Sequence, residues 1–196
     1  MVALALACAS TAQAAERIPA DILVPDPALA ATGTPAGPAR GVDRWGREVV
    51  PVLESPAWVG DGLALVHPDA DAAAAMVLLP LEAAARAARR GHWGDGTWRV
   101  QDAAGRIRGQ AGDLVLVEGT VVAVGWAGDR LYLNFGTDRS TDVTARVERS
   151  ALPAVAAGGV DPEALAGRRA RLRGWLAFAG GPLLELTGPA QLELLP

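Results

Sequence analysis

The segment LVLVEGTVVAVGW, residues 114–126, decides the fold of the C-terminal half of this chain. Its valine and leucine residues favour a strand, and the Gly128-Asp129 pair that follows is typical of a tight turn. We predict one long strand with a bulge or bend at Gly119, because a glycine inside a strand often marks such a site. Two shorter strands are expected next, over residues 131–135 and 143–147.

A short helix is expected after the third strand. Asp161 stands where an N-cap belongs, Pro162 has the first helical position, and Gly167 ends the segment. Two further strands are predicted over residues 170–178 and 183–186, and residues 191–195 close the unit. Three strands, a helix and then two strands is the order of the OB-fold, a small five-stranded barrel with its helix between strands three and four.

The N-terminal half is organised around a second segment, GVDRWGREVV at residues 41–50. Asp43 and Gly46 are turn residues, and the valines that follow favour a strand. Residues 79–93 are predicted as a helix, with Glu82 and Arg86 in the favourable order for an ion pair and Gly91 as a left-handed C-cap. The alanine-rich residues 69–79 are also helical by propensity, so Pro80 must start a new helix or kink this one.

These two segments resemble the staphylococcal nuclease (thermonuclease) family. The resemblance is carried by the turn Asp43-Arg44-Trp45-Gly46-Arg47 and by Gly91-His92-Trp93 at the end of the helix. It implies a phosphodiesterase ancestry in which Arg47 would stabilise the charged transition state, since a guanidinium can hold two phosphate oxygens at once. The alternative is that Arg47 is a solvated turn residue.

The C-terminal half resembles the OB-fold domain that follows the nuclease domain in proteobacterial thermonuclease-like proteins. The matching segments include residues 132–136, 142–144 and 171–175. The chain departs from that family at Val143, where an aromatic residue is usual, and it lacks a tryptophan shortly before Asp142. Both losses weaken the base-stacking role that the resemblance implies.

The parts of the nuclease that perform catalysis have no counterpart in the sequence. Residues 15–40 are rich in proline and alanine and are predicted as a loop with at most one edge strand. The acidic turn, the second arginine and the glutamate base of the family are missing, so we expect no cofactor and a catalytically degenerate protein. A segment upstream of residue 1 that supplied these motifs would instead make the protein an active calcium-dependent nuclease.

The first 14 residues are apolar and end in Ala12-Gln13-Ala14, the pattern of a secretory cleavage site. We therefore expect a signal peptide over residues 1–14 and a periplasmic or secreted protein, with a mobile N-terminal tail as the alternative. Cleavage would remove Cys8, the single cysteine, and leave no disulfide. The apolar run is too short to span a membrane.

Single-stranded nucleic acid is the predicted ligand of the OB-fold, which binds bases on aromatic platforms and phosphates on basic side chains. Residues 113–196 nevertheless hold eight arginines against ten acidic residues, a net charge of −2, whereas nucleic-acid binders usually carry a basic surface. The alternative is an interaction or scaffold module for a protein partner. The candidate stacking residues are Trp126, Tyr132, Phe135 and Trp175, and the candidate phosphate ligands are Arg130, Arg139, Arg146, Arg171 and Arg173.

The sequence therefore predicts a mainly β protein (β-barrel, α+β), in which a truncated nuclease-like barrel with two helices at residues 41–108 precedes an OB-fold at residues 113–196. An incomplete barrel leaves unpaired backbone groups. We expect the OB-fold domain or a second copy of the chain to cover them.

Overall fold

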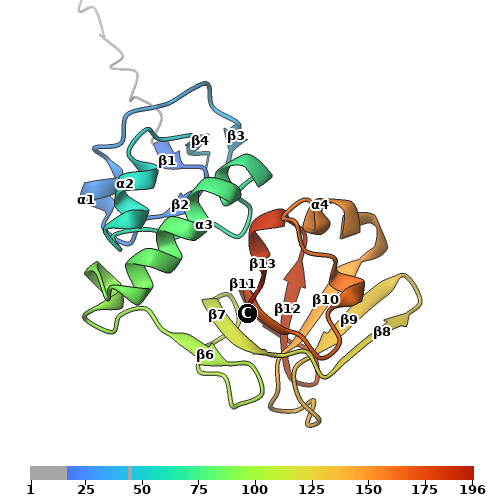
Figure 1. Ribbon diagram of the computed structural model, residues 1–196. Helices are drawn as coiled ribbons and strands as arrows, with labels where there is room; N and C mark the ends of the chain where they lie inside the picture. The colour runs from blue at the N-terminus through green and yellow to red at the C-terminus, as the bar shows by residue number, and fades with distance from the viewer. Residues whose placement is uncertain (1–16, 44–45) are drawn as a thin grey trace, which may run out of the picture.

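The computed structural model describes residues 17–43 and 46–196 (Figure 1). The predicted signal peptide, residues 1–14, lies outside the described residues, as do Arg44 and Trp45 of the turn motif. The fold is mainly β, as the sequence predicts.

The C-terminal half forms a closed barrel. β7 pairs antiparallel with β11, β11 antiparallel with β12, and β12 parallel with β10; β10 and β8 each pair antiparallel with β9. Because β8 follows β7 after two residues, the two are halves of one bent strand and the path closes. This is the strand order of the OB-fold, with α4 between its third and fourth strands. The elements are β7 (Leu114–Thr120), β8 (Ala123–Ala127), β9 (Arg130–Asn134), β10 (Thr144–Glu148), α4 (Leu152–Ala156), β11 (Arg169–Phe178), β12 (Pro182–Leu186) and β13 (Leu192–Leu194), the last of which extends the pairing along β11.

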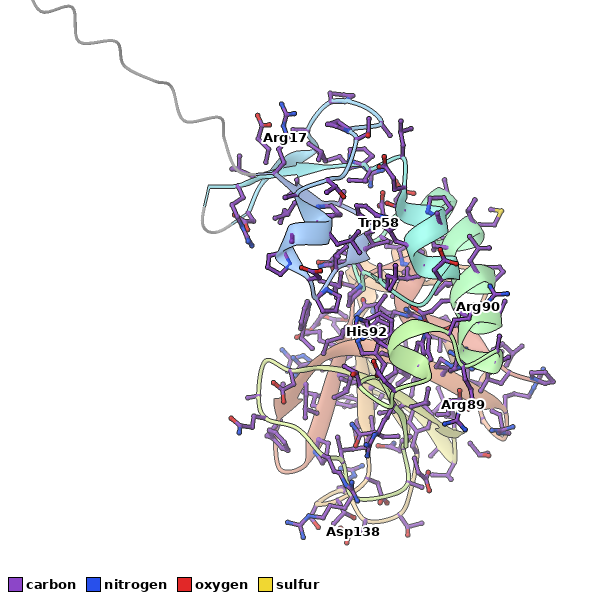
Figure 2. The ribbon with its side chains drawn as sticks, turned by 90° about the vertical axis from the view of Figure 1, so that its left-hand side faces the viewer. Arg17, Trp58, Arg89, Arg90, His92 and Asp138 are labelled. Carbon is purple, nitrogen blue, oxygen red and sulfur yellow. The ribbon has the colours of Figure 1, made fainter. Side chains whose placement is uncertain are left out.

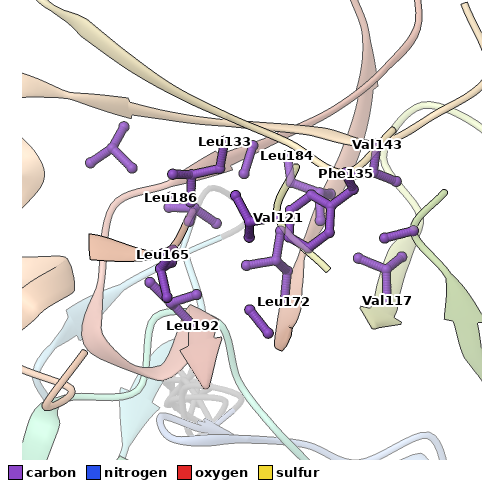
Figure 3. Packing of buried hydrophobic residues seen from close by; sticks show 14 of the residues in the cluster. Val117, Val121, Leu133, Phe135, Val143, Leu165, Leu172, Leu184, Leu186 and Leu192 are labelled. Atoms are coloured by element: carbon purple, nitrogen blue, oxygen red, sulfur yellow. The ribbon is translucent and has the colours of Figure 1, made fainter. Parts of the chain in front are cut away.

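Alternate side chains of these strands fill the barrel (Figure 3). Leu131 and Leu133 of β9, Leu172 of β11, and Leu184 and Leu186 of β12 are all fully buried. Each buried leucine of this kind contributes roughly 1.5–3 kcal/mol through loss of apolar surface to water. The barrel interior is therefore a packed core, and only the outward-facing residues can meet a ligand.

Two details of the barrel differ from the sequence predictions. Gly119 lies in regular register opposite Ala170, and the strand bends after it at Val121 and Val122. A Cβ atom at Gly119 would lie 3.0 Å from Ala103 Cβ and 3.0 Å from a ring carbon of Phe135, so close packing explains this glycine.

The helix of the barrel also begins earlier than predicted. It spans Leu152–Ala156, and the segment capped by Asp161 forms only a 3₁₀ turn, η3 (Pro162–Ala164). The predicted cap itself is confirmed, because the Asp161 side chain accepts a hydrogen bond from the amide of Glu163. Asp161 is therefore an N-cap, as predicted, but the segment that it caps is a 3₁₀ turn and not an α-helix.

The described residues of the N-terminal half form two small sheets and three α-helices. The prediction of at most one edge strand before residue 41 is wrong, because this segment supplies β1, β2 and α1. One sheet has the order β1-β4-β3 and the other pairs β2 with β5. The elements are β1 (Arg17–Pro19), β2 (Ile22–Leu23), α1 (Pro27–Ala30), β3 (Gly41–Val42), β4 (Glu48–Val50), α2 (Ser55–Gly60), β5 (Leu65–Val66), α3 (Ala72–Ala87), η1 (Gly91–Trp93) and β6 (Val100–Asp102).

Helix α3 runs without a break through Pro80. Proline has no amide to donate to the carbonyl of Met76, but both residues are exposed, so water can hydrate that carbonyl. The helix ends at Ala87, and Arg89 (φ 53°) adopts the left-handed conformation just beyond it. Gly91 (φ 49°) is also left-handed, but it opens η1 and does not cap α3.

Candidate nucleic-acid interface

A hollow of about 460 Å³ lies on the outer face of the barrel, across β8, β9, β10 and the start of β12. Leu131 and Leu133 point inward, so Tyr132 between them points outward. Tyr132 lies directly opposite Arg146 in the ladder between β9 and β10. Four of the predicted site residues line this hollow together: Trp126, Tyr132, Arg139 and Arg146.

The loop between β9 and β10 carries Arg139 and is held by its own hydrogen bonds. The Asp142 carboxylate accepts the amide of Asp138, and the Asp138 carboxylate accepts both the amide and the hydroxyl of Ser140. The bonds from Ser140 also hold the pKa of Asp138 below its ordinary value. Figure 2 shows Asp138 at the end of the molecule far from Arg17, so this loop projects away from the N-terminal half.

The arginines around this face are largely paired with acids. Arg146 Nη2 lies 3.1 Å from Glu185 Oε2 on β12, and Arg130 Nε donates to Glu148 Oε1 at 2.7 Å. The hydrogen bond to Glu148 is the main reason that the pKa of Arg130 is raised. A phosphate at this face would therefore compete with existing carboxylates, which limits its affinity.

Trp126 is 37% exposed and forms one rim of the hollow. Its indole Nε1 donates to Glu163 Oε1 at 3.0 Å, and the guanidinium of Arg149 lies 4.1 Å from the ring centroid. Arg149 is itself paired with Asp129. These contacts fix the orientation of the ring but cover part of the surface on which a base would stack.

Phe135 is not part of the interface, contrary to the prediction. It is 1% exposed and packs in the barrel core with Leu172 and Val117 (Figure 3). The predicted strand over residues 131–135 already placed Phe135 on the same face as Leu131 and Leu133. Strand alternation could therefore have excluded Phe135 from the predicted interface.

Arg171 and Arg173 are also buried, at 7% and 1% exposure, which contradicts their predicted role as phosphate ligands. Arg173 binds both carboxylate oxygens of Glu82 on α3, through Nη1 at 2.7 Å and Nη2 at 2.8 Å. Arg171 is bound by Glu118 and Glu193, and Glu193 also accepts from Arg173 Nη2. These side chains form a network of alternating charge on β11 that reaches α3 through Glu82, and Arg173 Nε, which has no partner within the described residues, is buried.

The electrostatics of Arg173 follow from this network. Burial by itself lowers the pKa of Arg173, but the charges of Glu82 and Glu193 outweigh it, and the net direction is upward. The guanidinium also donates to the main-chain oxygen of Val66 in β5, at 3.2 Å. Arg173 therefore joins α3 and β5 to the barrel.

Trp175 lies on β11, away from the hollow, where its ring meets His67 edge-on at a centroid distance of 5.9 Å. Its ring is 42% exposed. The amide of Asp69 donates to His67 Nδ1, and burial lowers the pKa of His67 although Asp69 and Asp21 oppose that shift. Trp175 thus belongs to the junction with the N-terminal half and does not share a site with Tyr132.

Arg47 follows the hairpin turn between β3 and β4, as the sequence predicts for its backbone. Its Nε and Nη2 atoms hold one carboxylate oxygen of Asp43, at 2.8 Å and 2.7 Å, and its amide donates to the other oxygen at 2.9 Å. Asp43 therefore directs the guanidinium back onto the turn. The contact between Asp43 and Arg47 therefore stabilises the turn.

A calcium site like that of the nuclease family does not fit the acidic residues present. The Asp43 carboxylate is engaged by Arg47, and Asp21 is bound by Arg40 Nη1 at 2.6 Å. Within residues 17–43 and 46–196, no group of three or more histidine, cysteine, aspartate or glutamate side chains could hold a metal ion. In the same ranges, no helix is long and apolar enough to cross a membrane.

Two polar residues that line the hollow were not among the predicted site residues. Asn134 and Thr144 lie opposite each other on β9 and β10, beside the pair formed by Tyr132 and Arg146. The alternation of residues 143–147 was the available signal, since it places Thr144 and Arg146 on the same outward face.

No family model matches this sequence, and no curated protein matches it. Among solved structures, an OBody bound to hen egg-white lysozyme is 19% identical over 43% of this chain and 81% of its own, with a TM-score of 0.34. The asparaginyl-tRNA synthetase from Pyrococcus horikoshii is 18% identical over 43% of this chain, with a TM-score of 0.31, and the aspartyl-tRNA synthetase from Entamoeba histolytica is 17% identical over 44%, with a TM-score of 0.30. This chain covers 20% of each synthetase chain. At these scores no functional argument rests on the likeness, and the OB-fold assignment rests on strand order and register.

Proposed function

We propose that this protein is a non-catalytic binding protein that holds a short single-stranded nucleic acid in the hollow of β8, β9 and β10. The observation that supports this is the pairing of an outward aromatic ring, Tyr132, with an outward guanidinium, Arg146, at adjacent ladder positions. A base can stack on the ring, which is worth roughly 1–3 kcal/mol, while the guanidinium meets a neighbouring phosphate. Arg139 on the projecting loop supplies a second cation at the rim.

The ion pairs around the hollow determine how strong this binding is. Glu185 already neutralises Arg146, so a phosphate gains less than it would from a free arginine. We therefore expect weak binding that decreases as salt increases from about 50 to 200 mM, because phosphate contacts release counterions.

The first test measures fluorescence anisotropy of labelled oligothymidylate and oligouridylate with the mature protein. Tyr132→Ala is expected to weaken binding by about 5- to 100-fold, from the loss of one stacked base. Tyr132→Phe is the matched control, because it keeps the ring and should retain most of the affinity. Equal loss in both variants would show that the hydroxyl and its local contacts matter and that stacking does not.

A charge test addresses the phosphate contact. Glu185→Gln releases Arg146 and should tighten binding, with a salt slope steeper by about 0.7 for one added phosphate contact. Arg146→Ala should weaken binding, whereas Arg168→Ala removes the same charge at an exposed position outside the hollow and should change little. If neither oligonucleotide binds in a salt-dependent way, the proposal fails and a protein partner becomes the better assignment.

The nuclease ancestry and the export of the protein belong to the same proposal. They are supported only by the turn motif at residues 43–47 and the apolar segment at residues 1–14. Incubation of single-stranded DNA with the protein and calcium should give no cleavage. Calcium-dependent cleavage that disappears in Arg47→Ala would contradict the non-catalytic assignment. The mass of the protein recovered from a periplasmic fraction should correspond to a chain that begins at Ala15.

A further inference from the structure

We propose that a second cavity, of about 600 Å³ and bordered by β5, β6 and β7, binds a phosphomonoester that carries an apolar ring, such as a mononucleotide. This volume lies within the range of roughly 300–1,000 Å³ that is usual for small-ligand sites. Apolar side chains and an indole form part of the wall, and three arginines stand at its border. The residues that carry the argument are Leu65, Trp98, Arg99, Arg106, Arg108 and Leu116.

The arginines of this cavity are available to an anion, in contrast to Arg146 in the hollow of the barrel, which is paired with Glu185. Within the described part of the chain, the side chains of Arg106 and Arg108 form no hydrogen bond or ion pair, and both residues are exposed. Arg99 Nε donates to the main-chain oxygen of Gly96 at 3.0 Å, and its two terminal nitrogens have no partner among residues 17–43 and 46–196, so they can meet a phosphate. A guanidinium is the side chain best shaped to bind two phosphate oxygens.

Two carboxylates, Asp102 and Asp113, share the cavity and leave it with a net charge of +1. One oxygen of Asp102 accepts the amide of Ala104 at 3.0 Å, and one oxygen of Asp113 accepts the amide of Gln110 at 2.7 Å. Their other oxygens can accept hydrogen bonds from ligand hydroxyls. The charge balance favours a ligand with a compact anionic group and neutral polar groups, and a polyanion would be repelled by the aspartates.

The loop that carries Arg106 and Arg108 is fixed before any ligand arrives. Ile107 between them is buried in the barrel core, and the two exposed arginines border the cavity. The Gln101 side chain donates to the main-chain oxygen of Arg108 at 2.9 Å and accepts its amide at 2.7 Å. A preorganised loop lowers the entropic cost of binding.

The indole of Trp98 supplies a surface for the ring of the ligand. It is held edge-on against Trp93 and His92, at centroid distances of 5.4 Å and 4.9 Å. Leu65 and Leu116 extend the apolar wall beside it. A base or comparable flat group can therefore lie against apolar surface while its phosphate reaches the arginines.

The test is isothermal titration of the full chain with adenosine 5′-monophosphate, adenosine and inorganic phosphate at constant ionic strength. The monophosphate should bind at least about tenfold more tightly than adenosine or inorganic phosphate, because it alone uses both parts of the cavity. Arg106→Ala and Arg108→Ala should each weaken it by about tenfold, whereas the matched control Arg168→Ala should not. Absence of binding by the monophosphate, or equal binding by all three arginine variants, would overturn the proposal.

The phosphate could belong to a free nucleotide or to the end of a nucleic-acid strand. Competition with oligoadenylate, either 5′-phosphorylated or unphosphorylated, separates the two sources, since only a phosphorylated end should displace the monophosphate if strand ends bind here. Tyr132→Ala tests independence from the hollow of the barrel, and it should leave monophosphate binding unchanged. Loss of monophosphate binding in Tyr132→Ala but not in Arg106→Ala would assign the ligand to the barrel and overturn this site.

Discussion

At the scale of single residues, the contact between Glu82 and Arg173 does the most to join the two halves of the chain. Both side chains are 1% exposed, and their carboxylate and guanidinium are bound by two hydrogen bonds. Glu82→Gln leaves the buried Arg173 guanidinium with Glu193 as its remaining carboxylate partner, and the loss of one member of a buried pair typically costs up to about 3–5 kcal/mol. We expect Glu82→Gln to lower the free energy of unfolding by an amount within that bound, measured by urea denaturation followed by circular dichroism.

Two comparison variants separate the effect of breaking an ion pair from the effect of leaving a buried charge without its partner. Glu48→Gln breaks the exposed pair with Arg17 and should cost less than about 1 kcal/mol. The double variant Glu82→Gln, Arg173→Met removes both charges, keeps a side-chain oxygen that can accept the amide of Val66, and should recover most of the stability lost in Glu82→Gln. A double variant as unstable as the single one would show that the pair itself, and not the orphaned charge, sets the stability.

At the scale of loops and strands, a close approach between two loops positions Arg139 at the hollow. A Cβ atom at Gly181, in the turn before β12, would overlap the main-chain oxygen of Arg139. Gly181→Ala must therefore push the loop that carries Arg139 away from the barrel. We expect weaker oligonucleotide binding, by several fold, with a barrel that still unfolds cooperatively.

Gly180→Ala is not a suitable control for this effect, because Gly180 has a left-handed backbone (φ 77°) that strains any other residue. Gly125→Ala is suitable, since Gly125 lies on β8 with open space around its Cα. Binding that falls equally in Gly125→Ala and Gly181→Ala would show that added bulk in the hollow, and not displacement of the loop, is responsible.

Local and distant contacts of the strands explain which features of the barrel could be predicted from the sequence and which could not. The strand order of the barrel was predictable, because alternation and turn residues are local signals. The alternation of β9 and β10 accounts for the outward positions of Tyr132 and Arg146. Alternation failed for Arg171 and Arg173, since a residue that points out of a barrel is exposed only if nothing else packs there, and α3 packs there. The ion pair of Glu82 with Arg86 that helical spacing predicts is present at 3.9 Å, but the closer partner of Glu82, Arg173 at 2.7 Å, is 91 residues away.

At the scale of the whole molecule, the N-terminal half shares part of its apolar core with the barrel. Leu65, Ala85 and Trp93 pack with Leu116 of β7, and Ala190 packs with the core around α2 and α3. Strand β6 pairs with β7 in parallel and covers one edge of it (Figure 1). A fragment of residues 17–108 would expose these surfaces and lose the partner of Glu82, so we expect it to lack cooperative unfolding on its own.

The measurement compares thermal unfolding of the intact chain, the fragment 17–108 and the fragment 113–196, followed by both circular dichroism and tryptophan fluorescence. The intact chain should unfold in one transition by both probes, and mixing the fragments should restore ordered signal to residues 17–108. Light scattering of each sample is the control for self-association, which was the alternative way to cover the open edges. A fragment 17–108 that unfolds cooperatively as a monomer would show that its small sheets and α3 are sufficient, and the contacts with β7 and Arg173 would then be docking contacts between two independently stable units.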